Sequence, residues 1–127
     1  MLLYHISNKS NLKILNPFIP SCALVGHEDR KTPRICFSSR IEGCLSAIDC
    51  ASKFYVYTPI DGIEVHKPTV DECRDAKYTD EVWALESVPV RCLGRIEATY
   101  LDKFDRHNSG RGRVLVYQYT YKWLNQI

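Results

Sequence analysis

Short segments rich in β-branched and aromatic residues recur along this 127-residue chain and constrain its fold more than any other feature. Residues 54–58 and 114–123 alternate in the two-residue period of a half-buried strand. Further strand-like segments are residues 2–6, 35–37, 63–66, 81–85, 90–93 and 96–101. We therefore expect strands to dominate the fold.

One helix is expected among these strands. Ser39 is followed three residues later by Glu42, which is the pattern of a capping box at a helix N-terminus. Apolar residues then recur at helical spacing, at Ile41, Cys44, Leu45 and Ile48. The sequence therefore predicts a helix over about 40–51 and an α+β fold class, with a bent mixed or antiparallel sheet. A weaker capping box, Thr69 with Glu72, opens at most a short helix.

Length and charge indicate one ordinary globular domain. The chain carries 17 Lys and Arg against 15 Asp and Glu, for a net charge of +2, and 45% of its residues are hydrophobic. These values exclude a disordered tail and a histone-like binder of polyanions. We expect a single domain over residues 1–127, with the C-terminal region 105–127 as the candidate addition to it.

The N-terminus and the cysteines predict a cytoplasmic protein. No basic segment followed by an apolar one opens the chain, and no run of about 18 apolar residues occurs. The six cysteines are expected to be reduced and to pack as small apolar residues, with disulfide or metal roles as alternatives. No Cys-x-x-Cys pair occurs, so we expect no metal site.

Three short constellations are candidates for a binding or catalytic site. The first is Tyr4-His5-Ile6-Ser7, where the imidazole can exchange hydrogen bonds with a ribose hydroxyl; the alternative is a structural histidine at a strand edge. The second runs from Arg34 to Ser38 and Ser39, where a helix N-terminus with added positive charge would bind an anion. Its alternative is a well-capped helix.

The third constellation surrounds Glu81. Strand alternation puts Glu81, Trp83 and Leu85 on one face and Val82, Ala84 and Glu86 on the other. A carboxylate beside a large aromatic would be partly desolvated, and it would orient a ribose hydroxyl or stabilise positive charge on a sugar. The alternative is an exposed carboxylate at a sheet edge.

The C-terminal segment offers a different kind of surface. Aromatic residues alternate there, at Tyr117, Tyr119, Tyr121 and Trp123, after a basic segment that includes Arg111 and Arg113. Single-strand nucleic-acid binders use such stacking platforms, whereas an ordinary half-buried strand is the alternative. The net charge of +2 does not favour strong binding to a phosphate backbone.

The order of these constellations resembles the small ADP-ribosyltransferase-like superfamily, which includes diphtheria-toxin-type transferases and tRNA 2′-phosphotransferases. Leu3-Tyr4-His5-Ile6-Ser7 is similar to the Tyr-His-Gly-Ser/Thr start of these proteins. Glu81 in Glu-Val-Trp-Ala-Leu is similar to their catalytic glutamate, which also begins a late strand. The resemblance covers residues 2–96.

The resemblance implies a split, bent sheet that holds NAD in its cleft. Glu81 would be the catalytic residue, bonding the nicotinamide ribose and stabilising an oxocarbenium-like transition state. The cofactor-binding residues would be His5, Ser7, Arg34, Ser38 and Tyr55, the last (or else Tyr57) in place of a helical tyrosine that this chain lacks. The chain departs from the family pattern at Ile6, where glycine is usual, and at Thr79, where arginine-specific transferases carry an acidic residue.

Three readings follow. The leading one is an ADP-ribosyltransferase-like domain that binds NAD and transfers ADP-ribose to an unknown acceptor. The second is a non-catalytic module that binds a nucleotide, RNA or a protein through the Tyr-rich C-terminal strand. The third is a 2′-phosphotransferase-like activity, which would need an arginine cluster drawn from Arg34, Arg40 and Arg91.

Overall fold

The computed structural model describes residues 2–19, 29, 31–41, 44, 52–73, 80–104 and 113–123, with the backbone alone for 52, 98–104 and 113–123. Within these residues the chain forms seven strands, and every pair of them is antiparallel. The strands are β1 (His5–Ser7), β2 (Ile14–Leu15), β3 (Ile35–Ser38), β4 (Ser52–Pro59), β5 (Glu81–Ala84), β6 (Val88–Phe104) and β7 (Arg113–Trp123).

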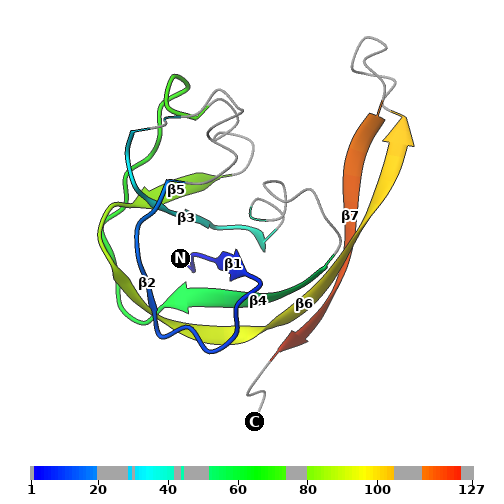
Figure 1. Cartoon of the computed structure of the whole chain (residues 1–127), viewed down its shortest axis with the longest axis horizontal. Helices are drawn as coiled ribbons and strands as arrows, with labels where there is room; N and C mark the ends of the chain where they lie inside the picture. Colours follow the sequence, from blue (N-terminus) through cyan, green and yellow to red (C-terminus); the bar gives the residue numbers. More distant parts are fainter. Residues whose placement is uncertain are drawn as a thin grey trace.

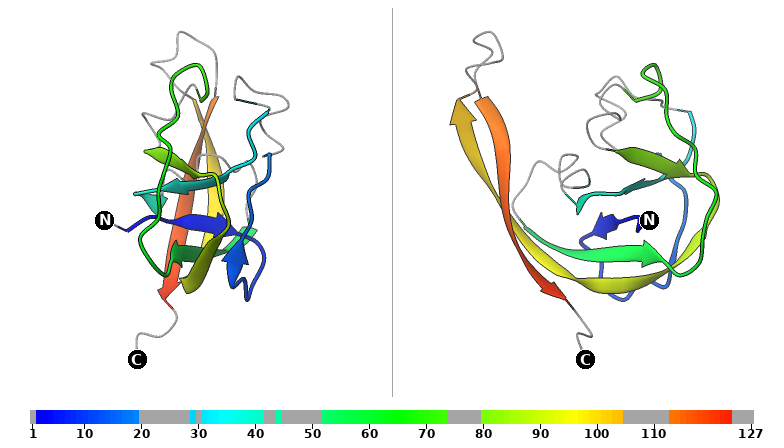
Figure 2. Two further views of the ribbon diagram at one scale, coloured as in Figure 1. Left: turned by 90° about the vertical axis from the view of Figure 1, so that its left-hand side faces the viewer. Right: turned by 180° about the vertical axis from the view of Figure 1, so that it is seen from behind.

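The strands form two sheets. The larger has the order β1-β4-β6-β2, with β7 also paired to β6, and the smaller consists of β3 and β5. Figure 1 shows β5, β3, β1, β4 and β6 stacked in that order, with β6 curving under the stack. The β6–β7 ribbon extends away from the stack, and the view from behind shows the same arrangement (Figure 2).

Two isolated bridges connect one edge of β3 to the N-terminal part of the chain. Tyr4 and Ser38 exchange both backbone hydrogen bonds, at 2.7 and 2.9 Å, and Phe18 and Arg34 do the same at 3.1 and 2.9 Å. The opposite edge of β3 pairs with β5 along its whole length. β3 is therefore the strand through which the two sheets meet.

The α+β prediction is wrong for the part of the chain that the structure describes. Its regular structure is almost entirely β, and no helix occurs among its elements. Of the predicted helix at 40–51, only residues 40, 41 and 44 are described, and the amide of Cys44 lies 3.4 Å from the carbonyl of Arg40. The described residues also contain no helix long and apolar enough to cross a bilayer.

The strand content was underestimated because β6 is one strand of 17 residues, whereas the sequence predicted two short ones. Proline and glycine normally weaken a strand. Pro89 has no amide to donate, but its carbonyl still accepts a hydrogen bond from the amide of Ile60 at 3.1 Å. Gly94 pairs with Val56 on one side and Trp123 on the other, so β4 and β7 hold β6 together across the glycine.

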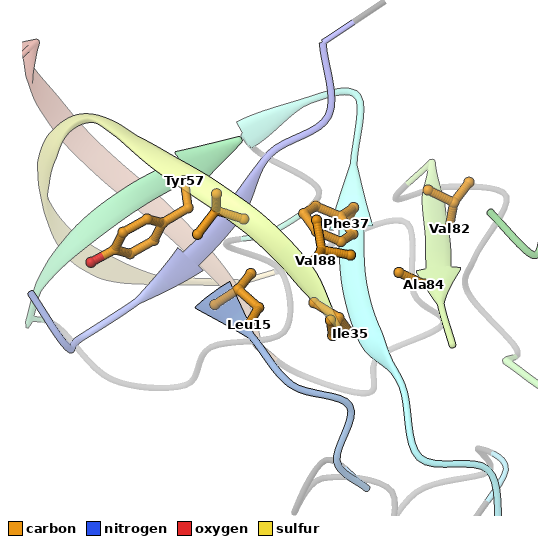
Figure 3. Packing of buried hydrophobic residues seen from close by; sticks show 8 residues of the cluster. Leu15, Ile35, Phe37, Tyr57, Val82, Ala84 and Val88 are labelled. Atoms are coloured by element: carbon orange, nitrogen blue, oxygen red, sulfur yellow. The ribbon is translucent and has the colours of Figure 1, made fainter. Parts of the chain in front are cut away.

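The main core lies between the two sheets. Ile35 and Phe37 of β3, with Val82 and Ala84 of β5, pack against apolar residues of the larger sheet (Figure 3). Those partners are Leu15, Tyr57, Val88 and Val90. The opposite face of the small sheet is left to Arg34, Cys36 and Ser38 and to Glu81 and Trp83, because side chains alternate along strands. This second face carries the candidate site.

Candidate functional site

Ser38, Glu81 and Tyr4 lie side by side on three neighbouring segments. Ser38 faces Glu81 in the β3–β5 register, and its backbone exchanges hydrogen bonds with Tyr4 on the other edge. Because its amide and carbonyl are directed to Tyr4, Ser38 forms with Glu81 the kind of antiparallel pair whose side chains approach most closely. The three candidate constellations, which contain Tyr4, Ser38 and Glu81, therefore meet in the fold.

Trp83 holds the carboxylate of Glu81. The indole Nε1 donates to Glu81 Oε2 at 2.6 Å, and Trp83 itself is fully buried. The sequence correctly predicted that these two residues share one face of the strand. Among the described residues, no other donor bonds this carboxylate, so Oε1 remains for a further hydrogen bond.

A second layer of side chains packs around Trp83. The guanidinium carbon of Arg34 lies 4.1 Å from the centre of the indole ring, a cation–π contact. The His66 imidazole lies 5.6 Å from the same ring and bonds Glu72 at 2.9 Å. The amide of Thr69 also donates to Glu72, and this bond, followed by that of His66, lowers the pKa of the Glu72 carboxyl. Trp83 is thereby fixed in orientation.

Arg34 is inside the protein. Its side chain is fully buried, and Nη1 donates to the carbonyls of Asp29 and Thr32 at 2.8 and 3.0 Å. The carboxylate of Asp29 is held by Thr32 and by the amide of Lys31, and these bonds lower its pKa. The sequence predicted Arg34 as an anion ligand, whereas in this structure its guanidinium bonds the backbone of Asp29 and Thr32.

The polar contacts after β3 differ from the predicted capping box. The amide of Arg40 donates to the hydroxyl of Ser38 at 3.1 Å, so Ser38 accepts a hydrogen bond from the following turn. The Ser39 hydroxyl lies 3.4 Å from Asp80, and Arg40 Nε bonds the same carboxylate oxygen at 2.8 Å. Glu42, the second half of the predicted box, lies outside the described residues.

Asp80 is a site residue that the sequence reasoning missed. It adopts a left-handed backbone with φ of 54°, which costs free energy for a non-glycine residue. Its carboxylate ties the start of β5 to Ser39 and Arg40 at the end of β3. Asp80 therefore fixes the position of the neighbouring Glu81 relative to Ser38. The local signal in the sequence was an aspartate directly before a strand. Asp adopts the left-handed backbone conformation more readily than most residues.

His5 lies at the same junction but on the core side. Its Nδ1 bonds the carbonyl of Cys36 at 2.8 Å, and its ring centre lies 5.8 Å from that of Phe37. Burial lowers the pKa of His5 more than this hydrogen bond raises it. Because a carbonyl only accepts, Nδ1 carries the proton, and the neutral ring keeps an acceptor at Nε2. The His5 side chain thus bonds the edge of β3 at Cys36, between the bridges that Phe18 and Tyr4 make.

The remaining predicted cofactor residues lie beside His5 and not beside Glu81. Ser7 pairs with Tyr55 in the β1–β4 register, and the Ser7 hydroxyl accepts from the amide of Lys9 at 3.1 Å. Tyr55 is partly buried against the main core. The structure thus groups Ser38 with Glu81 on one face and His5, Ser7 and Tyr55 on the other, with β1 and β3 between them.

The regions behind the two alternative readings are described only in part. The Tyr-rich segment is a strand, as predicted, and β7 pairs with β6 over its whole length. Its side chains and Arg111 lie outside what the structure describes. For the arginine cluster, Arg34 stacks on Trp83, Arg40 bonds Asp80, and Arg91 is exposed on β6 opposite Thr58.

The comparisons with known proteins provide no further guide: no family model, curated protein or solved structure matches this chain.

Proposed function

We propose that this chain binds NAD at the junction of β1, β3 and β5 and transfers ADP-ribose from it to an acceptor. The observation that carries the proposal is the direct pairing of Ser38 with Glu81, next to the bridge from Ser38 to Tyr4. Two segments far apart in sequence thereby supply a hydroxyl and a carboxylate on one face of the small sheet. Those are the groups that a ribose with a cationic leaving group requires.

Glu81 has the central chemical role in this proposal. When the bond between ribose C1′ and nicotinamide breaks, nicotinamide leaves with the electron pair and positive charge develops on the ribose. The Glu81 carboxylate stabilises that charge, because a fixed anion in a partly buried site acts without reorganising. The bond from Trp83 to Oε2 holds the carboxylate in place, and Oε1 accepts from a ribose hydroxyl. The acceptor nucleophile then bonds C1′ and releases its proton to water.

The supporting residues have distinct roles. Ser38 lies across from Glu81 and presents the end of β3 to the nicotinamide half of the ligand. His5 lies on the opposite face and supports the site indirectly, because the bond from its Nδ1 to the Cys36 carbonyl holds β1 against β3. Arg34 has no direct contact with NAD in this proposal, because its guanidinium is buried. A cytoplasmic setting would provide both NAD and reducing conditions for the thiols.

The experiment that tests this function measures nicotinamide release from NAD by the purified protein. Glu81→Gln keeps an oxygen for Trp83 Nε1 but removes the negative charge, so we expect release to fall by about 100-fold or more. Glu97→Gln is the matched control, because this exposed carboxylate faces Lys53 on the larger sheet. If the wild-type protein neither binds NAD nor releases nicotinamide, the proposal is wrong.

A further inference from the structure

A groove of about 580 Å3 lies on the far side of β5 from β3, between residues 62–66 and 83–88. Its volume is within the range of roughly 300–1,000 Å3 that is typical of ligand sites. None of the residues placed in the candidate NAD site, namely Ser38, Glu81 and His5, lines it. The groove is therefore a separate feature that needs its own explanation.

The groove exists because two extended segments diverge. His66 and Trp83 exchange both backbone hydrogen bonds, at 2.7 and 2.8 Å. Among the described residues, this bridge is the only backbone pairing on that edge of β5. No further backbone pairing joins residues 62–65 to residues 85–87, which are all described, and both segments line the groove as a slot between two stretches of backbone. An extended peptide fits such a slot, because strand edges bind extended chains through their backbone groups.

The slot has an apolar lining. Ala84 and Val88 are buried at its base, and Val65 and Leu85 flank it with 42% and 48% of their surfaces exposed. Exposed aliphatic side chains on both sides of a groove favour an occupant that is itself partly apolar, because contact removes that surface from water.

The charge of the lining is of one sign. Glu64 and Glu86 are exposed carboxylates, and the lining contains no lysine or arginine. His66, the other titratable lining residue, is already bonded to Glu72. We propose that the groove binds an extended peptide segment that carries lysine or arginine between apolar residues. The carboxylates attract the basic side chains, and Val65 and Leu85 contact the apolar ones.

This peptide site does not depend on the proposed function, although the two sites share one residue. Trp83 lines the groove and also donates to Glu81. A peptide in the groove would therefore lie beside the residue that orients the candidate catalytic carboxylate. The test below measures binding only, so its failure would leave the NAD proposal standing, and the reverse also holds.

The probe is a fluorescein-labelled heptapeptide that alternates leucine and arginine, titrated with the full chain and followed by fluorescence anisotropy. Two comparison peptides alternate leucine with glutamate and serine with arginine. We expect saturable binding of the leucine–arginine peptide alone. Binding of the serine–arginine peptide with equal affinity would overturn the proposal, because it would show attraction by charge without recognition of shape.

Gly62 allows the site to be tested without disturbing the fold. A Cβ at this position would meet no atom within 4 Å, so substitutions there are sterically free. Gly62→Arg adds a repelling charge to the lining, and we expect it to weaken binding by about fivefold or more. Gly62→Glu is the matched control and should leave affinity equal or higher. Equal affinities for the two variants would contradict the proposal.

The carboxylates give a second, independent set of variants. Glu64→Gln and Glu86→Gln should each weaken the leucine–arginine peptide by about threefold to fivefold. Glu97→Gln removes the same charge from the larger sheet and should change nothing. A concentration-dependent dimer of the protein that Gly62→Arg dissociates would also overturn the proposal, because a second copy of the chain would then be the occupant.

Discussion

Ser38 and Glu81 lie directly opposite each other on β3 and β5, and the backbone of Ser38 bonds Tyr4 on its other edge. In antiparallel sheets, pairs of this type bring their Cα atoms to about 4.5 Å and their side chains into contact range. This relationship places a hydroxyl beside a carboxylate although the two residues are 43 positions apart in the chain. The functional proposal depends on it, as do the predictions that follow.

Ser38→Ala should destabilise the protein by about 1 kcal/mol, because the amide of Arg40 loses its acceptor in a buried position. Ser39→Ala should cost less, since its contact with Asp80 is long, at 3.4 Å, and exposed. Urea unfolding of both variants measures the difference. Equal losses would mean that Ser39 is the capping residue, as the sequence alone predicted.

Trp83→Ala should destabilise the protein by about 3–5 kcal/mol, because a fully buried indole leaves a large cavity and removes the partner of Arg34. Trp83→Phe keeps an aromatic face for the guanidinium and should cost less. It also removes the donor to Glu81, so nicotinamide release should fall even where the fold is retained. Thermal unfolding and the release assay test the two effects separately; Trp83→Phe with full activity would argue against the orienting role.

Stability should depend on pH through His5. Its pKa is lower in the folded than in the unfolded protein, where it is about 6.5, so the unfolded state binds more protons below that pH. The contribution of His5 to the free energy of unfolding is therefore fully present above pH 6.5. It is lost as the pH falls towards the pKa of His5 in the folded protein. His5→Asn keeps a donor for the Cys36 carbonyl and cannot titrate. Its unfolding free energy should vary less between about pH 5 and 6.5; an unchanged slope would contradict this assignment.

Asp80 should tolerate asparagine but not valine. Asp80→Asn removes an ion pair in which both side chains are about half exposed, and such pairs contribute only about 0–1 kcal/mol. Asn also accepts the left-handed backbone at φ 54°. Asp80→Val should cost about 1–3 kcal/mol more, since β-branched residues are strained there. Chemical denaturation of both variants checks the order, and equal stabilities would show that the backbone relaxes.

The strands were predictable from the sequence wherever alternation was strong. Residues 35–37, 54–58, 81–85 and 114–123 correspond to β3, β4, β5 and β7, and the predicted division of residues 81–84 between two faces was also correct. The continuity of β6 was missed because the effect of Pro89 and Gly94 depends on their partners across the sheet. Local propensity cannot report such partners.

One contact of the candidate site was predictable from the sequence, whereas the arrangement of the other candidate residues was not. The spacing of Glu81 and Trp83 indicated a carboxylate beside an indole, and the structure has that bond. The burial of Arg34 depends on a stacking partner 49 positions away, and the separation of His5 from Ser38 onto opposite faces depends on sheet register. Both are long-range properties that short motifs do not encode.

The most direct measurement of the central claim is an NMR titration of the protein with NAD, observed at the two tryptophan indole N–H signals. The Trp83 signal reports the bond to Glu81, and Trp123 on β7 is the internal control. We predict that NAD shifts the Trp83 signal saturably, that Trp123 stays unchanged, and that Glu81→Gln weakens the response. A Trp83 signal that stays unmoved at millimolar NAD would contradict the proposed site.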